Sequence, residues 1–459
     1  MEKPKIKSLE EILFTSELNI PKYQRPYKWS AKNVNQLLDD ILVHSDKIAY
    51  RLGTLVVHHD LKKKELNIVD GQQRLLTLSL IAYELLQTEI APKLKRFSVE
   101  NLSISNVKID NEVSINNLKK NQAIIKSRIK EFTRDTILFF FEKCEFVHIK
   151  LKDISEAFQF FDSQNTRGKD LEPHDLLKAY HLRKMVGNTE EEKIQCVTKW
   201  EEVSDELHTV FVHYLYKVRQ WCKGRSGLHF NKNKIGVFKG VSVEDTNNYN
   251  FVQPYRISHY FTEKYNNDIY RKIDLSHRDY PFQIDMVMLD GKRFFEYVHY
   301  YANLIHKIQN AYNDKVSDES ILSNLTEEES TAKEIFNLLR TYHGRNRTGD
   351  LYVKNIFDCC ILYYVDKFGD HKLEEAIVKF FLWSFTPRLE KRAVKEVTAD
   401  NHGKAYNGFF RTIREAVHTN DIIHKSLDLV NYVGNDKAVK NLGSIVKMFT
   451  ELKAIRTNG

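Results

Sequence analysis

The stretch LNIVDGQQRLLTLSL, residues 66–80, joins a strand pattern, a glycine turn and a helix pattern. A short apolar run ends at Asp70-Gly71, and apolar residues then recur with helical spacing. Glycine permits a sharp turn, and the first turn of a helix carries unpaired N–H groups and the positive end of the helix dipole. Arg74 lies in that turn, where a guanidinium can pair with two phosphate oxygens. The stretch therefore predicts an anion cradle, although an ordinary strand-to-helix connection capped by Asp70 fits the same pattern.

Further motifs stand in order on both sides of this stretch. Upstream, IPKYQRPYKW (residues 20–29) precedes an amphipathic run, and LGTLVV (52–57) has the pattern of a buried strand; downstream is FDSQNTRGKDL (161–171). Together they resemble the N-terminal domain of GmrSD-type restriction proteins, whose fold is similar to ParB and sulfiredoxin. The resemblance covers residues 10–185, and the matching positions are Ile20, Pro21, Tyr23, Gln24, Arg25, Tyr27, Trp29, Leu52, Gly53, Asp70 to Leu75, Thr77, Leu78, Phe161, Asn165, Arg167, Gly168 and Leu171.

The resemblance implies a nucleotide pocket, because members of this family respond to or hydrolyse nucleoside triphosphates. Asp70 and Arg74 would be the catalytic residues, and Asp70 would bind Mg²⁺ or orient Arg74. A P-loop sequence is absent and no general base follows from the pattern, so nucleotide binding is a firmer expectation than hydrolysis. The residues implied in nucleotide binding are Gln24, Arg25, Gly71, Gln72, Gln73, Asn165, Arg167 and Gly168.

Several motif residues also fit a purely structural role. Tyr23, Tyr27 and Trp29 are better explained by packing than by base stacking. Gln24 also fits a role in tying its loop to the backbone.

Composition is that of a soluble globular protein, with 459 residues, 42% hydrophobic and 29% charged. No apolar stretch is long enough to cross a bilayer, and the N-terminus has no apolar export segment. Five cysteines without a C-x-x-C pair predict reduced thiols, with no disulfide or zinc site. We therefore expect a cytoplasmic protein.

The patterns predict an α+β chain, with a ParB/sulfiredoxin-like domain over residues 1–187 and a large, mainly helical region over 188–459 that binds DNA or a partner. Residues 119–141 are expected to be helical, and residues 145–151 alternate like a strand. The Gly-, Asn- and Tyr-rich segment 223–284 predicts loops and short strands. Asp290-Gly291 predicts the turn of a small hairpin.

Many relatives carry or pair with an HNH-type nuclease domain, and the C-terminal region holds only a fragment of its pattern. Asn401, His402 and Asn407 have the right composition, but the spacing and the rest of the catalytic segment are missing. The loop HGRNRTG, residues 343–349, is basic and fits either a phosphate contact or a surface turn.

The net charge is +8, and residues 391–459 hold twelve Lys and Arg against seven Asp and Glu. Lys391, Arg392 and Lys395 predict a DNA-contacting cluster, and a solvated helix face is the alternative.

These observations lead to one main hypothesis for function. The chain would be a nucleotide-binding, NTP-hydrolysing sensor subunit of a prokaryotic anti-phage, modification-dependent restriction system. Its expected cofactors are a nucleoside triphosphate and Mg²⁺. Its expected partners are DNA and a separately encoded nuclease or same-family subunit, with self-association open. The rival hypothesis is a DNA- or protein-binding adaptor without nucleotide turnover, and a self-contained nuclease with an unrecognised site is a third.

Overall fold

A computed structural model describes most of the chain: residues 3–15, 18–21, 24, 26–60, 64–88, 99, 102, 112–152, 156, 172–244, 249–313, 319–323, 325, 330–431 and 442–455. The chain divides into two units. The first contains residues 1–171 and 185–202, and the second contains 172–184 and 203–459. Around the expected boundary at residue 187, the chain passes between the two units more than once. Residues 172–184 belong to the second unit, and residues 185–202 belong to the first.

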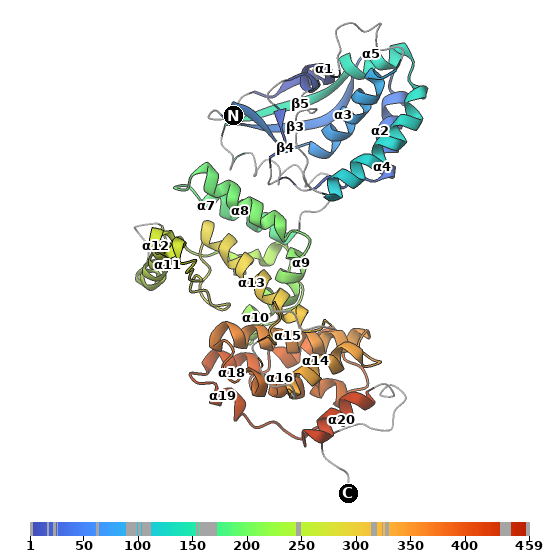
Figure 1. Cartoon of the computed structure of the whole chain (residues 1–459). Coiled ribbons are helices and arrows are strands. Elements are labelled where there is room, and N and C mark those ends of the chain that lie inside the picture. Colours follow the sequence, from blue (N-terminus) through green and yellow to red (C-terminus); the bar gives the residue numbers. More distant parts are fainter. Residues whose placement is uncertain are drawn as a thin grey trace. The chain divides into compact units, whose positions relative to one another are not determined.

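A five-stranded mixed sheet forms the centre of the first unit (Figure 1). Its spatial order is β1-β5-β3-β4-β2, with β3 parallel to β5 and antiparallel to β4. Consecutive residues 55–58 of β3 are all buried, so both faces of the central strand are covered. The strands are β1 (Lys5–Ser8), β2 (Leu18–Asn19), β3 (Tyr50–Asp60), β4 (Glu65–Asp70) and β5 (Cys144–Leu151).

The helices of the first unit are α1 (Leu9–Leu13), α2 (Ala31–Val43), α3 (Gln72–Leu86), α4 (Glu112–Arg128), α5 (Arg134–Glu142) and α8 (Glu190–Glu202), with a 3₁₀ turn over Ile129–Glu131. The predicted single helical stretch 119–141 is broken, because Thr133 caps a new helix with its side chain accepting from the Thr136 N–H. Inward side chains of α2, α3 and α5 pack with those of the sheet into one apolar core.

The second unit is helical. Its elements are α7 (Pro173–Lys184), α9 (Leu207–Thr209), a π-helical turn (Val210–Leu215), α10 (Tyr216–Trp221), 3₁₀ turns (Lys232–Phe238 and Asn250–Val252), α11 (Gln253–Asn267), α12 (Ile269–Ile273), α13 (Lys292–Asn310), α14 (Thr331–Thr341), α15 (Thr348–Phe368), α16 (Leu373–Glu390), α17 (Glu396–Gly403), α18 (Phe409–Glu415), α19 (Asn420–Ile423) and α20 (Gly443–Glu451). Helices α15 and α16 pack against each other at its centre, and α11 with α12 lies apart from them (Figure 1).

The α+β class is confirmed, with a mixed sheet in the first unit and helices in the rest. The likeness to ParB and sulfiredoxin stays a prediction. Two local expectations are wrong: Asp290-Gly291 begins helix α13 instead of turning a hairpin, and the segment 223–284 contains the helices α11 and α12. All five cysteines are buried and unpaired, as expected for reduced core thiols. No helix in the described part of the chain combines the length and apolar character needed to span a membrane.

Candidate functional site

Gly71 makes the turn that joins β4 to α3. Its φ of 93° and ψ of 1° place it in the left-handed region, where a side chain is strained. A Cβ atom at this position would also lie 3.1 Å from both the Thr54 carbonyl oxygen and a Leu55 methyl carbon of β3. Gly71 itself is the N-cap residue and no side chain caps the helix, so the expected cap by Asp70 is wrong, whereas an ordinary strand-to-helix connection still fits. The start of α3 is therefore held close to β3 by a position that only glycine fits.

Arg74, in the first turn of α3, extends over Gly53 of β3. A Cβ atom on Gly53 would come within 2.3 Å of the Arg74 Nη1, and Gly53 has a φ of 121°. The glycine therefore leaves the space that the guanidinium fills. Sequence reasoning matched Gly53 to the family pattern but did not identify this role, although a glycine early in a strand signals a close approach.

The Arg74 guanidinium is half-buried, and its burial outweighs the attraction of the described groups near it. Burial lowers the pKa of Arg74, and the nearby charges of Asp70 and Tyr50 raise it by less. Within the described residues Arg74 has no hydrogen bond or ion pair, while Asp70 has an interaction of its own. Five N–H donors beside a glycine turn and a helix start are thus available to an anion.

The three glutamines of the motifs, Gln24, Gln72 and Gln73, differ in their hydrogen bonds. Gln24 Nε2 donates to the carbonyl oxygens of Ile68 (2.9 Å) and Val69 (2.8 Å), which ties its loop to β4. Gln73 accepts from the Lys28 N–H (2.8 Å) and donates to the Pro26 carbonyl (3.1 Å). These two side chains therefore position the 20–29 loop, and a nucleotide contact by either stays a prediction.

Gln72 differs from both. It is 8% exposed, and its buried Oε1 has no hydrogen-bond partner in the part of the chain that the structure describes. Such an acceptor is costly when buried, and a water or a bound group would satisfy it.

Tyr27 packs, as predicted. Its ring is fully buried, its hydroxyl hydrogen-bonds with the Thr77 hydroxyl (2.8 Å), and Asn121 donates to it (3.0 Å). Trp29 packs against the same core. The predicted site residues Arg25, Asn165, Arg167 and Gly168, with Tyr23, lie outside the described residues.

A second candidate site lies in the second unit, where two basic loops meet. The buried Asp350 carboxylate accepts from Arg388 Nε (2.9 Å) and from the Tyr342 hydroxyl (3.0 Å), and it pairs with Arg347 (3.2 Å). A Cβ atom on Gly349, in the first turn of α15, would lie 3.0 Å from the Val394 carbonyl, so the end of the basic segment 343–349 contacts the loop 391–395.

This contact brings together two motifs that the sequence treated separately. Lys391, Arg392 and Lys395 are exposed on one loop, and His343 and Arg345 are exposed on the other. The cations thus come from two segments that are 40 residues or more apart in sequence, a juxtaposition that spacing alone does not reveal.

Metal-binding geometry is sparse. The described residues contain no group of three or more His, Cys, Asp or Glu side chains that could hold a metal ion. His402, the residue closest to a nuclease pattern, stacks on Trp383 at a centroid distance of 4.2 Å and hydrogen-bonds to its carbonyl (3.0 Å). Its role is packing.

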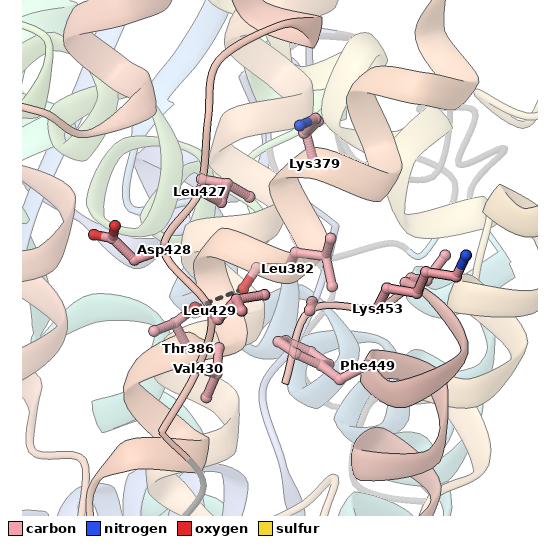
Figure 2. A pocket seen from close by; sticks show the side chains of 11 residues that line it. Lys379, Leu382, Thr386, Leu427, Asp428, Leu429, Val430, Phe449 and Lys453 are labelled. Carbon is pink, nitrogen blue, oxygen red and sulfur yellow. Dashed lines mark hydrogen bonds between the residues drawn. The ribbon is translucent and has the colours of Figure 1, made fainter. Parts of the chain in front are cut away.

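A small pocket of about 160 Å³ lies between α16, residues 427–430 and α20 (Figure 2). Its lining mixes apolar residues with Lys379, Thr386, Asp428 and Lys453, and two of these polar groups bond back to the chain. Thr386 Oγ1 donates to the Leu382 carbonyl (2.8 Å), and Lys379 Nζ donates to the Lys425 carbonyl (3.1 Å). Ligand sites usually present several polar groups that converge on the space, so we assign no site here.

Two family models match the chain. Residues 192–441, more than half of the chain, match a family of unknown function, DUF7834. The chain belongs to this family. Residues 9–182 match the N-terminal domain of the GmrSD restriction endonuclease, so the resemblance carried by the three sequence motifs is confirmed. The two matches leave only residues 183–191 between them, close to the expected boundary at residue 187. No curated protein matches the chain.

Proposed function

We propose that this DUF7834 member is the nucleotide-binding regulatory subunit of a prokaryotic restriction system. The N-terminal match to a restriction endonuclease domain supports the restriction context. The observation that carries the nucleotide part is Arg74, a half-buried guanidinium that makes no hydrogen bond or ion pair with a described residue, next to the Gly71 turn.

The residues present fit a polyphosphate. Arg74 would bind two phosphate oxygens with its planar fork, which compensates the burial that lowers its pKa. The first N–H groups of α3 point along the helix axis toward the same place, and Gly71 lets the ligand approach the backbone. The orphaned Gln72 Oε1 would accept a hydrogen bond from the bound group or its water. Gln24 and Gln73 would keep the described part of the 20–29 loop in position through their hydrogen bonds with Ile68 and Lys28.

Asp70 is the carboxylate that would hold Mg²⁺. A single protein carboxylate suffices when phosphate oxygens and waters supply the other ligands, which is the usual arrangement in phosphate sites. The ion would neutralise phosphate charge beside Arg74. No described side chain is placed as a general base, so hydrolysis would depend on positioning and charge stabilisation.

The paired basic loops of the second unit are the proposed DNA contact. Lys391, Arg392 and Lys395, with Arg345 from the other loop, would bind backbone phosphates without reading the sequence. Cleavage would belong to a separately encoded nuclease. The rival hypothesis, a DNA- or protein-binding adaptor, makes the same use of these loops but predicts no triphosphate binding.

Isothermal titration calorimetry of the full chain with a non-hydrolysable nucleoside triphosphate and Mg²⁺ tests the proposal. Arg74→Ala should weaken binding about ten- to hundred-fold, the equivalent of a charge-assisted hydrogen bond of roughly 1.5–3 kcal/mol. Arg51→Ala is the matched control, because Arg51 lies on the same sheet but already pairs with Glu145 (3.0 Å). Equal affinities for the wild type and Arg74→Ala would exclude this site, and no binding at all would favour the adaptor.

A further inference from the structure

Helices α11 and α12 present an unusual surface in the second unit. Seven large apolar side chains on or beside these two helices are each more than half exposed: Ile257, Tyr260, Phe261, Ile269, Tyr270, Ile273 and Leu275. Scattered single apolar residues are normal on a protein surface, but a concentration on two adjacent helices marks an interaction site.

Helix α11 is amphipathic, but its apolar face is exposed and its buried positions are polar. Its apolar residues Ile257, Tyr260 and Phe261 have the i, i+3, i+4 spacing of one helix face, and that face is exposed. Its buried positions are His259 and Thr262. A helix normally turns its apolar face to the core, so the exposed face of α11 is the one suited to burial against another molecule.

Polar contacts hold this inverted helix in place. Glu263 pairs with Arg293 (2.7 Å) and Lys292 (3.2 Å) at the start of α13. Asn266 forms two hydrogen bonds with the backbone of Arg278 (2.8 and 2.9 Å), and His259 stacks on Tyr280. The orientation is therefore fixed by specific bonds, and the outward apolar face is a built feature of the fold.

We propose that this α11–α12 face binds a second copy of the same chain across a two-fold axis. The exposed fractions of the seven residues equal about five fully exposed side chains, on the order of 800 Å² of surface. That area is what each partner contributes to a standard protein interface. It exceeds the largest apolar patch of a typical monomer, which is about 300–600 Å².

The charges around the face favour a second copy over nucleic acid. Among the side chains that the structure describes between residues 253 and 280, the charged ones that are exposed are three cations, Lys264, Arg271 and Arg278, and three anions, Asp268, Asp274 and Asp279. A two-fold contact places a patch against itself, so charges of both signs allow pairing without net repulsion. A phosphate backbone instead favours a surface of mainly positive charge, whereas these described side chains carry both signs in equal number.

Sedimentation velocity of the full chain over a concentration series tests this inference. The wild type should approach twice its 54.1 kDa mass at micromolar concentration and dissociate on dilution. The double substitution Ile257→Asp and Phe261→Asp should give a monomer at the same concentrations, with an unchanged circular dichroism spectrum. Val417→Asp is the control, because Val417 is equally exposed elsewhere in the second unit.

Three results would overturn the inference. A wild type that stays monomeric at about 100 µM has no such interface, because a standard interface of this area binds more tightly than that. A dimer that survives the double substitution uses another surface. Loss of DNA binding by the double variant, with the oligomeric state unchanged, would assign the face to nucleic acid. None of these results depends on triphosphate binding, so this inference and the proposed function can fail separately.

Discussion

Replacing Gly53 with alanine should displace the Arg74 guanidinium and weaken triphosphate binding while residue 74 itself stays arginine. The new Cβ would lie 2.3 Å from Nη1, and ordinary van der Waals contact begins near 3.4 Å, so the guanidinium must move by about 1 Å. Because the guanidinium is the end of a flexible side chain, it can swing away at little cost in stability. A displacement of this size is nevertheless enough to weaken a positioned contact by up to about a hundred-fold.

The stability cost should come from the backbone instead. Gly53 has a φ of 121°, a region essentially restricted to glycine, and alanine there should cost about 1–3 kcal/mol. Urea unfolding measures this cost, and calorimetry with the triphosphate measures the affinity. We expect Gly53→Ala to lose as much affinity as Arg74→Ala, and the double variant to lose no more than either. The control Gly187→Ala, with no atom near its new Cβ and no positive φ, should leave both quantities unchanged.

Two results would refute this reasoning. If Gly53→Ala binds triphosphate like the wild type, the guanidinium does not act from its position over β3. If the losses of Gly53→Ala and Arg74→Ala add in the double variant, the two residues act independently, contrary to their close contact.

Three further predictions concern the basic loops, the buried histidines and Tyr27. Replacing Lys391, Arg392 and Lys395 with alanine should reduce the slope of log K against log salt for DNA by about 0.9 per lost phosphate contact, measured by fluorescence anisotropy, whereas replacing the exposed Lys119, Lys120 and Lys126 of α4 should not. Burial lowers the pKa of His181 to about 3 and of His259 to about 4, so the unfolded chain binds their protons first and each costs the fold about 1.4 kcal/mol per pH unit as pH falls below 6.5. Asp366, whose pKa burial raises to about 7, opposes this loss by a similar amount in that range. The midpoint temperature of thermal unfolding, measured from pH 7 to pH 5, should therefore fall more steeply with decreasing pH for Asp366→Asn than for the wild type. It should fall less steeply for His259→Phe. Tyr27→Phe should lower the free energy of unfolding by about 1–2 kcal/mol in urea titrations, because its hydroxyl bonds to both Thr77 and Asn121.

The sequence predicted best where apolar periodicity and turn chemistry agreed. The run 66–80 has a clear strand, a glycine and a helix, and the structure has β4, Gly71 and α3 at those positions. Helix α11 was missed although Ile257, Tyr260 and Phe261 have helical spacing, because the Gly-, Asn- and Tyr-rich composition of the segment 223–284 favoured loops. The contact between the two basic segments joins Gly349 to Val394, 45 positions apart, and leaves no local pattern in the sequence.

The dipeptide Asp-Gly occurs at two helix starts, and the comparison shows what separates an anion site from a structural arginine. Gly71 and Gly291 both have positive φ, and each is followed within three residues by an arginine in the first turn of its helix. Burial lowers the pKa of both guanidinium groups. For Arg293, however, Glu296 (2.8 Å) and Glu263 (2.7 Å) outweigh burial and raise the pKa above its ordinary value.

For Arg74 burial prevails over the charge of Asp70. The Asp-Gly helix start therefore holds a cation paired with two carboxylates in the second unit and, among the described residues, a cation without an ion pair in the first. A partly buried charge is costly without a counter-charge, and this cost supports our proposal that a ligand supplies the anion at Arg74. A triphosphate provides that charge together with the oxygens that the guanidinium fork and the helix start can bind.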